Sequence, residues 1–198
     1  MSKRNMDMWA YCNEKSKVII NENNGHVEVQ DCCFLWDNFR GDTDQFGNAK
    51  KLTHVLIPMD KVQQLIDLGY TIKSYPVDKD KDGNVAVDDN GNPILMYFIK
   101  VNINMKSAVP PVVKLMTKFK GDISTRVLDD NSIGDLHGLD IALACISWNR
   151  YIRNQGKTTV VSAYMDKISV VAEEDSEFGG IIDDYLESYS ADDVVEEN

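Results

Sequence analysis

The sequence has 198 residues, of which 43% are hydrophobic, and its formal net charge is −11. Residues 173–198 hold 11 of the 32 acidic residues and no Lys or Arg, which leaves 21 acidic against 21 basic residues in 1–172. The length suffices for one well-packed domain with extensions, and a neutral domain with an acidic tail does not exclude an anionic partner such as nucleic acid.

Alternation of apolar and polar residues predicts strands along most of the chain. Residues 1–16 are polar and irregular, so we expect a flexible arm there. Asp60 and Gly69 bracket a predicted helix, Asp60–Leu68, and a second helix or turn is expected near Leu139–Ala144. The expected strands are Val18–Ile20, Val27–Trp36, Leu52–Ile57, Thr71–Tyr75, Ile94–Ile103, Val112–Met116, Ser124–Leu128 and Thr158–Val171.

These elements predict a mainly β domain over 17–172, a barrel or sandwich with one or two short helices. Turn signals in Asp78–Pro93 predict a hairpin insertion. Its acidic residues match part of a calcium loop, but helical flanks are missing, so calcium is the weaker alternative to a polar hairpin. The residues concerned are Asp78, Asp80, Asp82 and Asp89.

The four cysteines and the first residues bear on the compartment. Cys32 and Cys33 are adjacent in a strand-like run, so their side chains should point to opposite faces, and no cysteine pair has zinc-ligand spacing. The start lacks the apolar core of a secretion signal, and no run approaches the ~20 apolar residues of a membrane span. We therefore expect a cytoplasmic protein without membrane contact.

Cations and aromatic residues lie together in three segments, which is the composition that single-stranded nucleic acid requires for phosphate contacts and base stacking. The alternatives are a solvated strand face with core aromatic residues in the central stretch, a hairpin whose aromatic residues fold back on the barrel in the loop segment, and a barrel-closing hairpin with Trp148 buried near the end of the domain. The candidates are Tyr97, Lys100, Lys106, Lys114, Lys118, Lys120 and Arg126 in the central basic stretch; Trp36, Phe39, Arg40, Phe46, Lys50 and Lys51 in the loop after the second strand; and Trp148, Arg150, Tyr151, Arg153 and Tyr164 near the end of the domain.

Residues 173–198 are too acidic to bury much apolar surface, so we expect this tail to be disordered. Apolar residues interrupt the acidic run and predict a partner-binding segment, and the acidic charge should compete with DNA for a basic groove. The alternative is a solubility tag. The predicted partner-binding residues are Phe178, Ile181, Asp183, Asp184, Tyr185 and Leu186.

Evidence for catalysis is weak. The three histidines lack metal-binding spacing, and no phosphate loop or nucleophile motif is present. A metal-dependent nuclease would need converging carboxylates, for which the candidates are Asp129, Asp130, Asp135 and Asp140. We expect a binding protein that is not an enzyme and has no cofactor.

The order of several short motifs resembles that of OB-fold single-stranded DNA-binding proteins of tailed bacteriophages, over about residues 27–190. The motifs are Asn38-Phe39-Arg40-Gly41, Phe46-Gly47-Asn48, Val55-Leu56-Ile57, Leu68-Gly69-Tyr70 and Ser162-Ala163-Tyr164-Met165, followed by the acidic tail.

The resemblance implies an OB-type β-barrel that coats single-stranded DNA during phage replication or recombination in the infected host cell. It further implies recruitment of other proteins through the tail, and homo-oligomers are possible. Stacking would fall to Phe39, Trp148 or Tyr164, and backbone contacts to Arg40, Lys100 and Arg150. The alternative function is a phage protein-interaction or structural module, which would scatter the cations instead of grouping them with aromatic residues in one groove.

Overall fold

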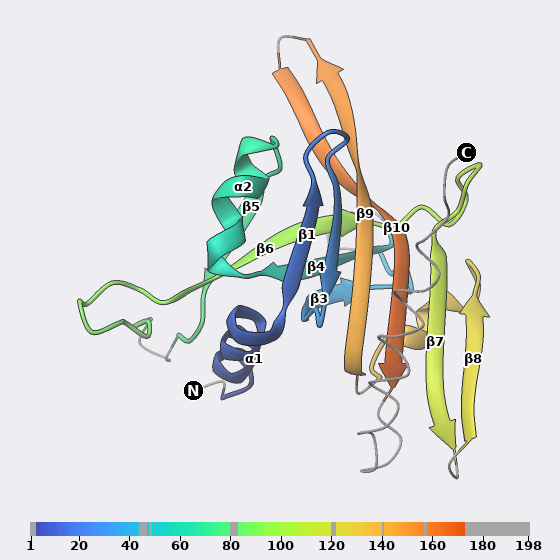
Figure 1. The fold of residues 1–198 in the computed structure, drawn as a ribbon, viewed down its shortest axis with the longest axis horizontal. Helices are drawn as coiled ribbons and strands as arrows, with labels where there is room; N and C mark the ends of the chain where they lie inside the picture. Colours follow the sequence, from blue (N-terminus) through green and yellow to red (C-terminus); the bar gives the residue numbers. More distant parts are fainter. Residues whose placement is uncertain are drawn as a thin grey trace.

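The computed structural model describes residues 3–43, 47, 49–79, 83–119, 122–139, 141–156 and 158–172. It confirms a mainly β fold, built on a ten-stranded sheet (Figure 1). In chain order the elements are α1 (Lys3–Lys15), β1 (Lys17–Asn21), β2 (His26–Gln30), β3 (Phe34–Asn38), β4 (Leu52–Ile57), the 3-10 turn η1 (Met59–Lys61), α2 (Val62–Asp67), β5 (Ile72–Pro76), β6 (Leu95–Asn102), β7 (Val112–Phe119), β8 (Asp122–Leu128), the 3-10 turn η2 (Ile133–Leu136), β9 (Ile141–Gln155) and β10 (Thr158–Ala172).

The main hydrogen-bonded path through the sheet is open and runs β1-β2-β9-β10-β6-β4-β3. Only Asp31–Cys33 separate β2 from β3, and the Cys32 amide donates to the carbonyl of Ala144 in β9. The chain therefore continues almost directly from β2 into β3 and closes the path. With β2 and β3 counted as one strand, a ring of five strands results, β2/β3, β9, β10, β6 and β4, in which only the β6–β10 pair is parallel. This arrangement is consistent with the expected OB-type barrel, which is a five-stranded and partly open barrel.

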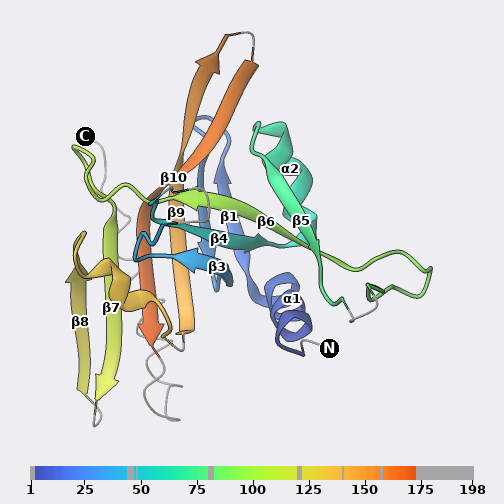
Figure 2. The same cartoon turned by 180° about the vertical axis from the view of Figure 1, so that it is seen from behind.

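Strand β10 connects the ring to an additional hairpin. Its first half pairs with β6 at Ala163 and Tyr164, and after a bulge between Met165 and Lys167 its second half pairs with β7. The β7–β8 hairpin consequently extends the sheet beside the second half of β10 (Figure 2).

The main core fills the inside of the ring. In β6 the alternation confirms the predicted core face, because Ile99 and Val101 are buried while Lys100 is exposed. Cys32 belongs to this core, whereas Cys33 packs in a second cluster, so the adjacent cysteines do point to different sides.

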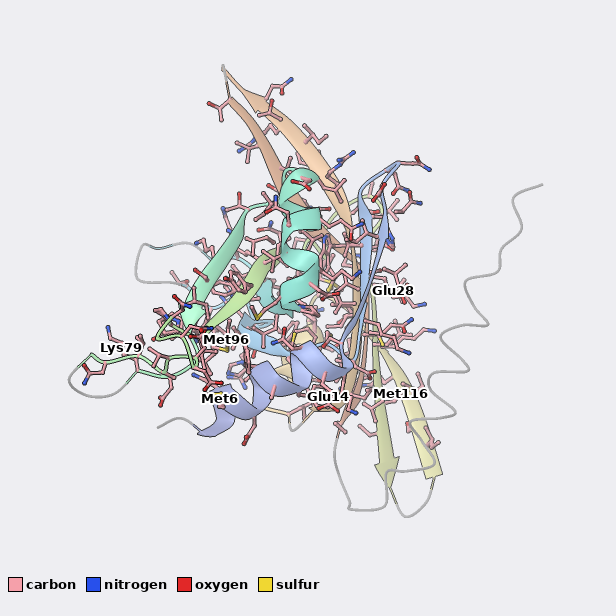
Figure 3. The ribbon with its side chains drawn as sticks, turned by 60° about the vertical axis from the view of Figure 1, so that its left-hand side comes forward. Met6, Glu14, Glu28, Lys79, Met96 and Met116 are labelled. Carbon is pink, nitrogen blue, oxygen red and sulfur yellow. The ribbon has the colours of Figure 1, made fainter. Side chains whose placement is uncertain are left out.

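The flexible arm expected at 1–16 is wrong for the described part, because Lys3–Lys15 form α1. The helix packs on the outer side of β4, where Cys12 is 2% exposed and clusters with Leu56. Met6 of α1 and Met96 of β6 belong to the same cluster (Figure 3). Apolar positions on one side of α1 thus override its generally polar composition.

Two further predicted elements differ from the structure. The strand predicted over Val27–Trp36 is broken at Asp31, whose φ of 51° is left-handed and redirects the chain from β9 to β4. The helix or turn expected near Leu139–Ala144 is instead the beginning of β9, because this short apolar run is buried within the sheet.

The expected helix Asp60–Leu68 is present as η1 followed by α2, without a capping hydrogen bond from the Asp60 side chain. It ends at Gly69, whose φ is +87°. A Cβ at Gly69 would lie 2.9 Å from Val161 of β10, so this position requires glycine for conformation and for space.

The insertion Asp78–Pro93 leaves the body between β5 and β6 (Figures 1 and 2). Isolated bridges Lys79–Val85 and Val87–Pro93 tie its described parts together, as expected for a hairpin excursion. Among the described segments, neither helix is both long and apolar enough to cross a membrane.

Candidate nucleic-acid interface

Four aromatic rings meet on the outer face of β3, β4, β5 and β6. The Trp36 ring makes edge-to-face contacts with His54, Tyr75 and Phe98 at centroid distances of 6.0, 5.4 and 5.3 Å. Trp36 has a φ of 40° beside a β-bulge and is 53% exposed. The bulge therefore turns a large aromatic side chain outward, where its face remains accessible.

Two lysines lie on the same face of the sheet. Lys73 of β5 is paired in register with Phe98, and Lys100 of β6 with His54. Both are exposed, and neither has an ion-pair partner in the described part of the chain. The pKa of His54 is lowered, first by burial and then by the positive charges of Lys100 and Lys73. A hydrogen bond between the His54 ring and the Trp36 carbonyl partly opposes this shift.

A cavity of about 240 Å³ continues from these lysines to β10. It lies where β5 and β10 pair with successive parts of the same edge of β6, and Lys73, Lys100, Asn102 and Ser162 contribute its polar groups. The Asn102 amide donates to the Ala163 carbonyl at 3.0 Å, which fixes its position at the junction of β6 and β10.

A second aromatic pair lies beyond this cavity. Tyr164 is paired in register with Asn102, so it lies on the outer face. Its ring makes an edge-to-face contact with Tyr151 at 5.6 Å, and the two tyrosines are 39% and 54% exposed. We call the surface formed by Trp36, Tyr75, Lys73, Lys100, Asn102, Tyr151 and Tyr164 the outer groove.

Three predicted aromatic contacts do not reach this surface. Phe39 and Trp148 are 1% and 0% exposed and belong to the main core, so neither can stack on a base, and their prediction as stacking residues was wrong. Tyr97 alternates with Lys100 and lies on the opposite face of β6. Packing inside the ring was the alternative left open for Phe39 and Trp148, and it prevails because both side chains belong to the main core.

Most of the predicted cations lie elsewhere. Lys51 and Lys106 pair with Asp130 at 2.5 and 3.5 Å, and Arg126 pairs with Asp135 at 2.6 Å. Together with exposed Arg40 they form a surface of mixed charge around η2, which we call the paired surface. Among the described cations of the predicted basic stretch, Lys106 and Arg126 belong to the paired surface, Lys114 lies on β7, and only Lys100 joins the outer groove.

Arg150 lies on the face of β9 opposite to Tyr151, where it extends over Gly25 and donates to the Leu68 carbonyl at 3.5 Å. Arg153 follows Tyr151 by two residues and so shares its face of the strand. Lys50 is exposed in the β3–β4 loop, and Lys114 lies on β7, apart from the outer groove.

Several predictions concern residues outside the described part of the chain. These are Phe46, Lys120, the side chain of Lys118, Asp80 and Asp82 of the calcium motif, and the tail residues Phe178, Ile181, Asp183, Asp184, Tyr185 and Leu186.

The sequence reasoning missed Lys73, Tyr75 and His54. The signal was present, because Lys73 and Tyr75 alternate within a predicted strand and so share a face. What the sequence did not show is that β5 pairs beside β6, in register with Phe98.

The carboxylates considered for a nuclease have structural roles where they are described. Asp129 accepts hydrogen bonds from Ser132 and the Asn131 amide, which lower its pKa, while Asp130 and Asp135 pair with cations. Among the described residues no group of three or more His, Cys, Asp or Glu side chains could hold a metal ion. The remaining candidate, Asp140, is outside the described residues.

The single-stranded DNA-binding protein from bacteriophage Enc34, in its C-terminally truncated form, is similar in structure with a TM-score of 0.41 and 14% identity, covering 82% of this chain and 98% of that one. The same protein in complex with ssDNA gives a TM-score of 0.39 and 14% identity, covering 83% and 98%. No curated protein matches the chain. The family described as "Putative phage ssDNA-binding domain" matches residues 16–178, and the chain belongs to this family.

Proposed function

We propose that the chain binds single-stranded DNA along the outer groove, without sequence specificity and without catalysis. The observation that carries this proposal is the grouping of two exposed aromatic pairs with Lys73 and Lys100 between them. Membership of the phage family supports the choice of ligand.

The groove provides the two interactions that single strands need. Exposed bases stack on aromatic faces at about 1–3 kcal/mol per base, and every base offers such a face, so sequence preference is weak. Trp36 and Tyr75 would receive bases at one end of the groove, and Tyr164 and Tyr151 at the other. The strand between them would place phosphates near Lys73 and Lys100, whose charges the described carboxylates leave unpaired.

The narrower parts of the function are also proposals. The protein would coat single strands during phage replication or recombination, in the cytoplasm of the infected cell. The acidic segment 173–198 would recruit other proteins through the apolar residues that interrupt its acidic run, because segments that order on binding can wrap a partner's surface. Homo-oligomers on the strand remain compatible with this function.

The direct test is a fluorescence-anisotropy titration of a labelled ~30-nucleotide oligo-dT at low and moderate salt, with a duplex of equal length as the control. We expect tight binding to the single strand only, weakening steeply with salt as counterions are released. The absence of binding at low salt, for both the full chain and a chain lacking residues 173–198, would exclude this function and favour a protein-interaction module.

A further inference from the structure

A patch of small and apolar side chains occupies the outer face of the sheet where β7, β10 and β9 run side by side. Register pairs Val171 with both Leu143 and Met116, and Ser169 with Cys145. Their neighbours Ile146, Val170 and Leu115 belong to the main core, so the patch lies on the opposite side of the sheet. We call Leu143, Cys145, Ser169, Val171 and Met116 the outer patch.

The outer patch is buried although it faces away from the core. Cys145, Val171 and Leu143 are 0%, 1% and 5% exposed. By contrast, Val127, on the outward side of the neighbouring strand β8, is 67% exposed, as expected for an uncovered sheet face.

The described elements provide little cover for this patch. The apolar side chains packed against Leu143, Cys145 and Val171 are Met116 and Ala142, which themselves lie in or beside the patch. Helix α1 packs on β4, shares a cavity with Leu143 and brings Tyr11 into the neighbourhood of Cys145, while α2 packs on β5.

We propose that the C-terminal segment of the same chain, through its apolar stretch 178–186, docks on the outer patch. The segment begins where the patch is, because β10 ends at Ala172, next to Val171. Phe178 follows six residues later and can reach about 20 Å, whereas three adjacent strands span only about 10 Å. Tethering at this distance gives an effective concentration on the order of millimolar, so weak contacts suffice.

Charge also favours this occupant. Lys114 is paired in register with Ser169, and Lys167 with Ser147, so both lysines border the patch on its outer side. Glu28 of β2 is also in register with Ser147, so one carboxylate accompanies the two lysines at this border. The docking segment combines Phe178, Ile181, Ile182, Tyr185 and Leu186 with Asp183 and Asp184, which complement an apolar surface bordered by lysines.

Cys145 provides a native probe, because its thiol lies at the centre of the patch and the cysteine is not in a disulfide. The full-length chain would be treated with N-ethylmaleimide without DNA, and the rate of modification at each cysteine measured by peptide mass spectrometry. The test variant replaces Phe178, Ile181 and Ile182 with Ser in the full chain. The matched control replaces the more distal Val194 and Val195 with Ser.

The test variant should react at Cys145 on the order of tenfold faster than the wild type, because modification then no longer waits for release of the segment. Lys114→Glu should also raise this rate, by repelling Asp183 and Asp184. The Val194/Val195 control should leave the rate unchanged, and Cys32 in the main core should stay protected in every variant.

An unchanged rate at Cys145 in the test variant would overturn the proposal, as would an equal rise in the Val194/Val195 control. A parallel rise at Cys32 would also contradict it, because general loosening would then explain the exposure. The measurement uses no DNA, so its outcome is independent of whether the outer groove binds single strands.

Discussion

The outer groove and the paired surface contain the same kinds of cation in opposite circumstances. In the paired surface, carboxylates already neutralise Lys51, Lys106 and Arg126 at 2.5 to 3.5 Å. In the outer groove, Lys73 and Lys100 have no described carboxylate within ion-pair distance and lie beside exposed aromatic rings.

This difference shows why a count of basic residues does not locate a binding surface. A lysine held by an aspartate must lose that partner before it can contact a phosphate, whereas an unpaired lysine only releases counterions. The central basic stretch of the sequence contributes to both regions, and most of its described cations lie outside the groove.

Removal of the Trp36 ring should have the largest effect on DNA binding. Trp36→Ala is expected to weaken oligo-dT affinity about 5- to 150-fold, which corresponds to the ~1–3 kcal/mol of one stacked base. Tyr11→Ala is the matched control, since Tyr11 on α1 is similarly exposed but outside the groove. Anisotropy titrations measure both, and equal losses in the two variants would contradict the assignment of the groove.

Salt dependence tests the two sets of cations directly. Replacing both Lys73 and Lys100 with Ala should reduce the slope of log affinity against log salt by about 1.4, since each phosphate contact on a single strand contributes about 0.7. Replacing Lys106 and Arg126 with Ala should leave the slope unchanged. A larger reduction for the second pair would mean that the paired surface, not the groove, holds the DNA.

Deletion of residues 173–198 should tighten oligo-dT binding severalfold at low salt, because the deletion removes 11 negative charges that compete with DNA for the lysines of the groove. The gain should vanish at high salt, where these charges are screened. Unchanged or weaker affinity at low salt would contradict a competing role of the tail.

The smallest expected effect is a difference between the two regions in the pH range over which they contribute to folding stability. The pKa of His54 is lowered from 6.5 in the folded chain, so the unfolded chain takes up more protons and stability is lost as pH falls below 6.5. A decrease in pH from 7 to 5 should therefore lower the melting temperature of the wild type more than that of His54→Gln, as measured by thermal unfolding.

The contribution of Asp130 to stability is also lost on acidification, but at a lower pH than that of His54. Its hydrogen bond with Lys51 lowers its pKa from 3.8, so its contribution is present above pH 3.8 and is lost as pH falls through the lowered value. Asp130→Asn should thus reduce stability at pH 7, and the difference should disappear in acid. A pH-independent difference for Asp130→Asn, or no difference for His54→Gln, would disagree with these assignments.

Local pattern determined a large part of this molecule. Alternation in β6 separated core residues Ile99 and Val101 from exposed Lys100, and the acidic composition of 173–198 separated a tail from a neutral domain. The predicted strands and the mainly β class followed from the same two-residue period, because alternate side chains of a strand point to opposite faces.

Tertiary structure decided which aromatic and charged residues are available for binding. Trp36 is exposed and Trp148 is buried, although both lie beside cations in the sequence, because a bulge turns the former outward while β9 turns the latter into the ring. Helix α1 forms where sequence composition indicates a loose arm, because its apolar side covers β4. Strand pairing brings Lys73, Lys100 and Tyr164 to one groove, whereas the segment between β8 and β9 brings Asp130 and Asp135 to the other cations. Which strands become neighbours depends on contacts between residues far apart in the sequence, and local alternation does not specify them.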